Sequence, residues 1–304
     1  MIITLAGNNS FLLQQELHLL TSEFVKEYTD MGLERFDGEE AEFDRMREAL
    51  ESLPFLASKK LVVLRAPSAN KEFVEKAEKL LAEVPETTDV IIYEPKLDKR
   101  SVYYKFLKKK TGYKEFSELD EYGLSRWLGE RAKTKGGSLN SGDTKYLIER
   151  LGANQQLLSN ELDKLLAYNP AITRESINML TEPNPQSTVF QLMDAAFAGN
   201  KKQVLKLYQE QRASKVEPQQ IIALLAWQLH ILAVVKTAGE RSDRDIAAEA
   251  KINPYVVGKS RAIARNLSLA RLKELVSQLT ELDLQLKTTA IDADDGVQAY
   301  LLSV

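Results

Sequence analysis

The chain has 304 residues, of which 44% are hydrophobic and 28% charged, close to ordinary globular usage, so we expect it to fold into two or three domains. Lysine and arginine number 41 against 44 acidic residues, and the formal charge of -3 leaves no global positive excess to hold nucleic acid. There is no cysteine, and His18 and His230 are the two histidines. This excludes disulfides, thiolate metal sites and cysteine nucleophiles, and we expect no metal site and no catalytic triad.

The beginning of the sequence lacks the basic start and apolar core of a signal peptide, so we expect a cytoplasmic protein. The longest apolar stretch, Ile221–Val235, is interrupted by Gln228 and His230 and is shorter than the about 20 apolar residues that cross a bilayer. We therefore expect no membrane segment. A helix that is apolar on nearly all sides needs cover from several neighbours, and we expect His230 to be a hydrogen-bonded core residue.

Short apolar runs alternate with helical patterns over the first 120 residues. The expected strands are Ile2–Leu5, Leu61–Leu64 and Val90–Tyr93, with weaker ones near Arg35–Phe36 and Tyr113–Phe116. The expected helices are one that carries Leu13, Leu17, Leu20 and Phe24, followed by Glu39–Leu50, Lys71–Val84 and Lys99–Lys109. Continuous apolar strands that alternate with helices predict a mostly parallel sheet with helices on both faces.

The strand signals stop after about Asp120. Helical patterns follow at Glu121–Lys135, Asp143–Leu151 and Asn154–Tyr168, and the Pro183-Asn184-Pro185 segment after them is interpreted as an interdomain linker, because proline cannot continue a helix. The helices expected beyond it are Val189–Ala198, Lys201–Gln211, Pro218–Thr237, Asp243–Ala250, Pro254–Asn266, Leu269–Lys287 and Asp292–Leu302. We expect three domains: an α/β domain at 1–119, a small helical domain at 120–183 and an all-α domain at 186–304.

The junction between the first strand and the first helix is where a doubly wound sheet binds phosphate. Here it contains one glycine, Gly7, and no lysine, so it is not a phosphate loop. The stretch Gly137–Thr144 imitates the spacing, but it has Asp143 in place of the lysine and follows a helix. Glu94 stands alone at the end of its strand, without the second acid that would hold magnesium. The sequence predicts an ATPase-like scaffold without ATPase chemistry and without a cofactor.

Six segments carry a resemblance to a known family. They are LAGNNSFLLQQEL from Leu5, SLPFLASKKLVVLRAP from Ser52, PKLDKRSVYYKFLKKK from Pro95, LSRWLGERAK from Leu124, LIERLGANQQLLSNELDKLLAY from Leu147 and LDLQLKTT from Leu282. Their order and spacing resemble those of the delta subunits of the bacterial DNA polymerase III clamp loader, over essentially the whole chain.

The resemblance implies an AAA+-like first domain that does not use ATP, a small lid-like helical domain and a C-terminal collar. It implies a protein that binds and opens the sliding clamp (beta), so that partner ATPase subunits can load the clamp on primed DNA during replication. The implied partners are the clamp and, through the collar, the other loader subunits (tau/gamma and delta prime). The chain resembles a subunit of a DNA-directed DNA polymerase holoenzyme, and we expect no catalytic residue in it.

The resemblance also assigns the clamp contact to the segment Leu53–Lys60. Leu53, Phe55 and Leu56 are large apolar residues beside a proline, and burying each against a partner is worth roughly 1.5–3 kcal/mol. The spacing alone also fits core residues at a helix end. The family often has leucine before phenylalanine, whereas here Phe55 precedes Leu56.

Two basic segments raise the question of DNA contact. The first, Lys96–Lys114, offers Lys99, Arg100, Lys105, Lys108 and Lys109 as possible DNA-contacting residues, although a solvated lysine face on an amphipathic helix fits equally. The second, Asp245–Arg261, has helix-turn-helix spacing, which alone would indicate a DNA-binding regulator; the resemblance favours a structural helix pair in the collar. The alternatives to a clamp-opening subunit are therefore this regulator and an AAA+ ATPase with a degenerate phosphate loop.

Overall fold

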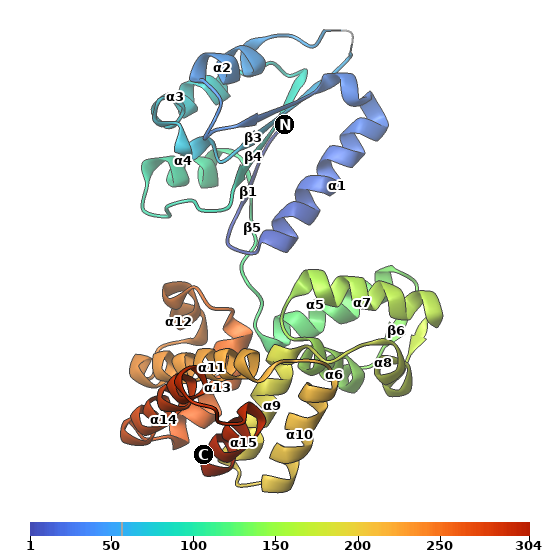
Figure 1. Ribbon diagram of the computed structural model, residues 1–304. Coiled ribbons are helices and arrows are strands. Elements are labelled where there is room, and N and C mark those ends of the chain that lie inside the picture. Colours follow the sequence, from blue (N-terminus) through green and yellow to red (C-terminus); the bar gives the residue numbers. More distant parts are fainter. Residues whose placement is uncertain (56) are drawn as a thin grey trace. The chain divides into compact units, whose positions relative to one another are not determined.

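The computed structural model describes residues 1–55 and 57–304, and it divides the chain into two compact units, 1–118 and 119–304 (Figure 1). Leu56, one of the three residues assigned to the clamp contact, lies outside the described residues. The first unit has the expected α/β fold, and it is one residue shorter than the range 1–119 predicted for that domain.

Unit 1–118 is built on a five-stranded sheet in the order β2-β3-β4-β1-β5, in which every neighbouring pair is parallel. The strands are β1 (Ile2–Ala6), β2 (Leu33–Asp37), β3 (Lys60–Arg65), β4 (Thr88–Glu94) and β5 (Gly112–Glu115). The three strands predicted from strong apolar runs, β1, β3 and β4, lie in the middle of the sheet. The two weaker predicted strands are its edges, where less burial is required.

Helices cover both faces of this sheet. They are α1 (Ser10–Tyr28), α2 (Phe43–Glu51), α3 (Lys71–Ala82) and α4 (Val102–Lys110). Figure 1 shows α1 on one face and the other three helices on the opposite face. Leu61 and Val63 of β3 point into the core under α1, whereas Val62 and Leu64 point into the core under α2 to α4. This alternation is the two-residue period of a strand, and it explains why β3 is apolar at four consecutive positions, Leu61–Leu64.

Unit 119–304 is helical apart from a two-stranded ribbon. Its elements are α5 (Glu121–Thr134), β6 (Ser138–Leu139), α6 (Ser141–Leu151), α7 (Gln155–Tyr168), β7 (Ala171–Ile172), α8 (Arg174–Leu180), α9 (Pro185–Phe197), α10 (Lys201–Ala213), α11 (Pro218–Ala238), α12 (Asp243–Ala250), α13 (Pro254–Asn266), α14 (Leu269–Thr288) and α15 (Ala293–Ser303). It contains two hydrophobic cores, one within α5 to α8 with Tyr255 of α13, and one within α9 to α15. These cores lie in the expected second and third domains, but they share one compact unit, and the three-domain division stays a prediction.

The Pro183–Pro185 segment, which the sequence suggested as a linker, ends inside a helix, because α9 begins at Pro185. Asn184 caps helix α9 by accepting a hydrogen bond from the Gln186 N–H, and Pro185 is the first residue of that helix. A proline there loses no intrahelical bond, because the first N–H groups of a helix have no partner in the helix. The sequence prediction also missed β6, β7 and α8, which are too short to give a periodic signal.

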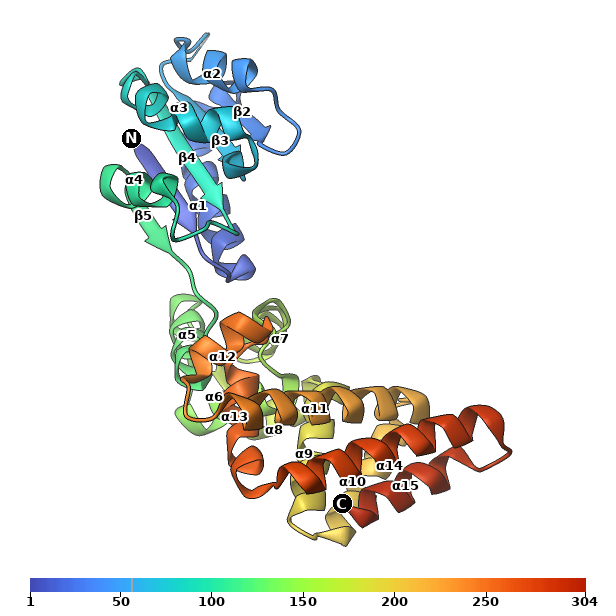
Figure 2. The ribbon, with the colours of Figure 1, turned by 90° about the vertical axis from the view of Figure 1, so that its left-hand side faces the viewer.

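Helix α11 is the one helix in the described part of the chain that is long and apolar enough to cross a membrane. In this structure it is the central helix of its core, packed against α9, α13, α14 and α15, and Figure 2 shows it running beside α14. Its exposed stripe contains Ala223, Ala226 and His230. The prediction of a buried, hydrogen-bonded His230 was therefore wrong: the residue falls on the narrow face that small side chains leave open.

Candidate functional site

The carboxyl edge of the sheet carries the junction between β1 and α1. Gly7 has a φ of +126°, and a Cβ built on it would lie 2.0 Å from the carbonyl oxygen of Phe116. The backbone of the two segments is joined by bonds from Asn9 N–H to Phe116 O (3.1 Å) and from Phe116 N–H to Ala6 O (2.8 Å). The Asn9 side chain donates to Ser117 O, and Glu118 N–H donates to Asn8 Oδ1. Residues 116–118 of the chain thus occupy the space beside the β1–α1 junction.

Glu94 ends β4 at the same edge of the sheet, where it is 1% exposed. Its carboxylate accepts hydrogen bonds from the backbone N–H of Ser68 (2.8 Å) and from the Ser68 hydroxyl (2.7 Å). Burial raises the pKa of Glu94, and the bonds from Ser68 oppose that rise. This carboxylate holds the turn that follows β3. It has a structural partner and is not presented to a metal or a nucleotide.

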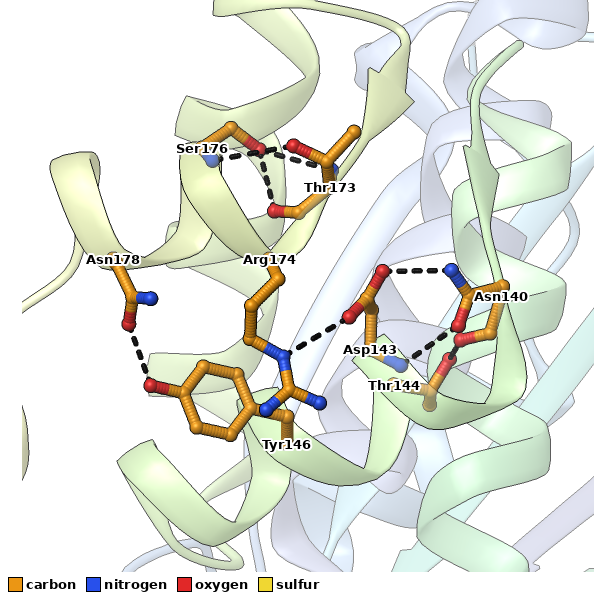
Figure 3. A network of polar contacts seen from close by, with 8 residues as sticks. All are labelled: Asn140, Asp143, Thr144, Tyr146, Thr173, Arg174, Ser176 and Asn178. Atoms are coloured by element: carbon orange, nitrogen blue, oxygen red, sulfur yellow. Dashed lines mark hydrogen bonds and ion pairs between the residues drawn. The ribbon is translucent and has the colours of Figure 1, made fainter.

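The stretch that imitates a phosphate loop is the start of α6 (Figure 3). Asn140 caps the helix: its Oδ1 accepts from Asp143 N–H, and its Nδ2 donates to Asp143 Oδ2. Arg174 donates to the other Asp143 oxygen at 3.2 Å and lies over the ring of Tyr146 at 3.7 Å. Figure 3 shows these side chains joining α6 to the start of α8. The polar side chains of this stretch therefore cap α6 and pack it against α8.

The loop 53–59 lies between α2 and β3, at the amino edge of the sheet. Leu53 is 71% exposed and Phe55 is 82% exposed, and among the other large apolar side chains described in this unit only Val102, at 81%, exceeds the exposed fraction of Leu53. Helix α2 buries Met46 and Leu50, so one more turn would place Leu53 on the same buried face. Pro54 prevents that turn, because a residue before proline is disfavoured in the helical conformation. Leu53 and Phe55 are therefore surface residues.

Lys60 closes this loop. Its side chain is 3% exposed, and its ammonium group donates hydrogen bonds to Ala49 O and to Ser52 O and Oγ (both 2.9 Å). Glu34 of β2 supplies a carboxylate oxygen at 3.6 Å. Ala49 O is one of the last carbonyls of α2, which have no partner within the helix. The residue that begins β3 thus caps the helix that precedes the loop.

The neighbouring lysine holds the same end of the loop from the other side. Lys59 pairs with Asp89 of β4 at 2.7 Å and lies over the ring of Tyr28 at the end of α1. The hydrogen bond to Asp89 raises the pKa of Lys59, which remains a cation at neutral pH. Asp89 is itself 6% exposed. Nothing in the sequence indicated that Lys59 and Lys60 hold the loop, since most of their partners lie on other elements.

Met31 is a further apolar residue at this edge that the sequence analysis missed. It is 66% exposed and lies in the turn before β2, the strand next to β3. A Cβ on the adjacent Gly32 would lie 2.5 Å from Lys59 O and 3.5 Å from the Cβ of Ala57. The backbone at Gly32 is therefore packed against the 53–59 loop. This packing places Met31 near the 53–59 loop, which is distant from it in the sequence.

The basic segment of the first unit is only partly available to a ligand. Lys99 pairs with Glu115, and Arg100 pairs with Asp98. Lys108 donates to the Tyr104 hydroxyl, while Lys105 and Lys109 are exposed. Lysines in the last turn of α4 also stabilise the helix dipole, which is reason enough for their position. Contact with DNA stays a prediction for all five residues.

The helix-turn-helix alternative concerns α12 and α13. A recognition helix needs an exposed basic face, but Lys259 lies over the rings of Phe190 and Tyr255. Arg261 pairs with Asp243 of α12 and also donates to Arg241 O. The structure thus uses these cations to fix α13 within the helical core, which disfavours a DNA-reading role for that helix. Residues 1–55 and 57–304 also contain no group of His, Asp and Glu side chains arranged to hold a metal ion.

A parallel sheet covered by helices on both faces and followed by a helical unit is the fold class expected from the sequence, and the same fold is found in a solved clamp loader protein described below. The family model for "DNA polymerase III, delta subunit" matches residues 4–117, and the model for the "C-terminal domain" of that subunit matches residues 186–304. The chain therefore belongs to the DNA polymerase III delta subunit family.

Individual relatives agree with this assignment. The chain is 25% identical over 321 residues to the DNA polymerase III subunit delta of Bacillus subtilis, covering 100% of this chain and 92% of that protein. It is 22% identical over 301 residues to the "Probable DNA polymerase III subunit delta" of Aquifex aeolicus, covering 93% and 85%. The solved structure of the Bacillus subtilis DNA clamp loader delta protein has the same fold, with a TM-score of 0.84, 24% identity and coverage of 99% and 94%.

Gly7→Ala is expected to destabilise unit 1–118 by about 2 kcal/mol or more, because the new Cβ meets the Phe116 carbonyl and the φ is positive. Gly112→Ala is the matched control in the same unit, since its nearest atoms are 3.5 Å away, and it should change stability by less than about 1 kcal/mol. Hydrogen exchange of the β4 amides in increasing urea measures both. Equal stability of the two variants would show that the junction is not closed as described.

Phe55→Ala is expected to leave the stability of the same unit within about 0.5 kcal/mol of the parent, because the side chain is on the surface. Leu50→Ala, three residues before the loop and fully buried, should cost about 2–5 kcal/mol. The same exchange experiment measures both variants. A cost for Phe55→Ala comparable to that of Leu50→Ala would mean that Phe55 belongs to the core.

Proposed function

We propose that this chain binds a DNA sliding clamp through the 53–59 loop and favours the opened form of the clamp, as the non-catalytic delta subunit of a clamp loader. The observation that carries the proposal is the pair of exposed apolar side chains, Leu53 and Phe55, on a loop with both ends held. Membership of the delta family, together with the likeness to a DNA clamp loader delta protein, supports a sliding clamp as the partner. Leu56 belongs to the same proposed contact.

The exposure of Leu53 and Phe55 has a physical use in binding. Side chains of this size gain roughly 1.5–3 kcal/mol each when they leave water, so two of them on one loop can dominate a small interface. Pro54 lies between them and limits the conformations that the loop loses on binding. Met31 extends the apolar surface toward β2, and we propose it as a weaker member of the contact.

Opening the clamp requires no covalent chemistry. A ligand that binds two states of a protein shifts their populations only by the ratio of its affinities for them. The 53–59 loop must therefore bind the open clamp more tightly than the closed ring. Residues of the β1–α1 junction take no part in this step, which supports a chain without catalytic activity of its own and with ATP hydrolysed by partner subunits.

The other loader subunits, tau/gamma and delta prime, are proposed to bind the collar at 186–304. Support comes from an apolar groove of about 440 Å³ between α11 and α14, whose lining includes Ile222, Leu229 and Leu279. Val276 of α14 lines the same groove and is 43% exposed, and Leu284 of α14 is 54% exposed. Apolar surface of this kind on a helix favours burial against another chain. We further propose that the assembled loader acts on primed DNA and that the protein is cytoplasmic, because bacterial replication takes place there.

Leu53→Ala and Phe55→Ala are each expected to weaken binding of the cognate sliding clamp about tenfold or more, because each removes buried apolar contact. Met31→Ala should weaken it less, by about two- to fivefold. Val102→Ala is the control, since Val102 is 81% exposed in the same unit but lies on α4. Titration calorimetry with the full chain measures all four variants. Unchanged affinity for Leu53→Ala and Phe55→Ala would remove the loop from the contact.

The preference for the open clamp can be measured by the same titration with two forms of the clamp. A clamp variant whose subunit interface is weakened spends more time open, so the chain should bind it more tightly than the parent clamp. Equal affinity for the two clamps would mean that the chain binds without favouring opening.

The full chain is expected to show no saturable binding of ATP with Mg²⁺, because the β1–α1 junction has no lysine and is bonded to residues 116–118. Titration with a fluorescent ATP analogue in the presence of Mg²⁺ measures this. Saturable, magnesium-dependent binding would favour the alternative of an ATPase with a degenerate loop.

A further inference from the structure

The 53–59 loop differs from most exposed loops in the way its ends are joined. Ser52 precedes the loop and Lys60 follows it, and the Lys60 ammonium group donates to both the carbonyl and the hydroxyl of Ser52 at 2.9 Å. The same group donates to Ala49 O, one turn earlier in α2. A single buried cation thus joins the two ends of the loop, and it does so from the first residue of β3, a strand paired on both sides in the sheet.

This arrangement is costly unless every donor is satisfied. A buried ammonium group loses its hydration, and three acceptors around it, with Glu34 at 3.6 Å, replace the lost water. A leucine or methionine at position 60 would fit a strand whose next four residues are apolar and buried. The lysine supplies what an apolar residue cannot, a set of directed bonds to the helix end on the far side of the loop.

We propose that Lys60 is a positioning residue for clamp binding, and that it acts by holding Leu53 and Phe55 in the binding conformation before the clamp arrives. The inference rests on the proposed function of the loop. A loop that samples its binding conformation for only a fraction of the time binds with an affinity reduced by that fraction. Closing the ends with Lys60 keeps that fraction high.

Lys60→Met tests the proposal, since methionine keeps an unbranched apolar stem but lacks the terminal ammonium group and donates no hydrogen bond. At a temperature where the variant is folded, clamp affinity should fall about tenfold, mainly through the fraction of binding-competent loop. Amides of the 53–59 loop should exchange faster in the free chain, while those of β4 stay protected. Ser52→Ala removes only one of the acceptors and should give a smaller effect in the same direction.

Two further variants separate positioning from general destabilisation. Thr4→Val removes the hydrogen bond between the Thr4 and Thr111 hydroxyl groups in the same unit, so it should lower stability without changing clamp affinity. In the Phe55→Ala background, Lys60→Met should weaken binding by clearly less than tenfold, because the side chain that it positions is gone.

The outcomes distinguish this inference from the proposed function. If Phe55→Ala weakens clamp binding but folded Lys60→Met binds like the parent, the loop is the contact and Lys60 only caps a helix. If Lys60→Met and Thr4→Val weaken binding equally for equal losses of stability, the effect is general and the positioning role is wrong. If neither Leu53→Ala nor Phe55→Ala weakens clamp binding, the loop is not the contact and the proposed function itself fails.

Discussion

The parallel sheet of the first unit is covered by helices on both faces. The loops at the two ends of its strands are therefore the parts of the sheet that are open to a ligand or partner. The carboxyl edge, where nucleotides usually bind in this class of fold, is closed by the backbone of residues 116–118 against Gly7 and Asn9. The amino edge carries the 53–59 loop and the turn at Met31. The proposed activity therefore lies at the opposite edge from the one that an ATPase uses.

A binding loop at the amino ends of the strands must keep large apolar side chains exposed to solvent. Large apolar side chains tend to fold back onto the nearest core, and the core under α2 extends along the helix as far as Leu50. Pro54 ends the helix before Leu53 can continue its buried face, and Lys60 holds the loop ends together. Exposure of Leu53 and Phe55 is thus maintained by the backbone and by buried polar bonds. Such a loop can present apolar surface with little loss of entropy on binding.

Several charged residues in segments that resemble ligand-binding motifs have structural roles instead. Glu94 holds the turn after β3 through Ser68, and Asp143 joins the caps and ion pair at the start of α6. Lys259 and Arg261 hold α13 in place. In each case a group that sequence patterns associate with ligands is engaged by a neighbour from another element, which lowers the free energy of the fold and leaves little for a substrate.

The sequence by itself determined the central strands and the long helices, because burial on two faces requires unbroken apolar runs and helical packing requires a regular period. It also determined the absence of a phosphate-gripping lysine. Tertiary structure decided whether Leu53 and Phe55 face the core or water, since the same spacing fits both. It also decided that Pro185 begins a helix, that His230 is exposed, and that Lys60 reaches Ala49 and Ser52. Those outcomes depend on which elements meet in space, and no local pattern encodes the partner of a side chain on another element.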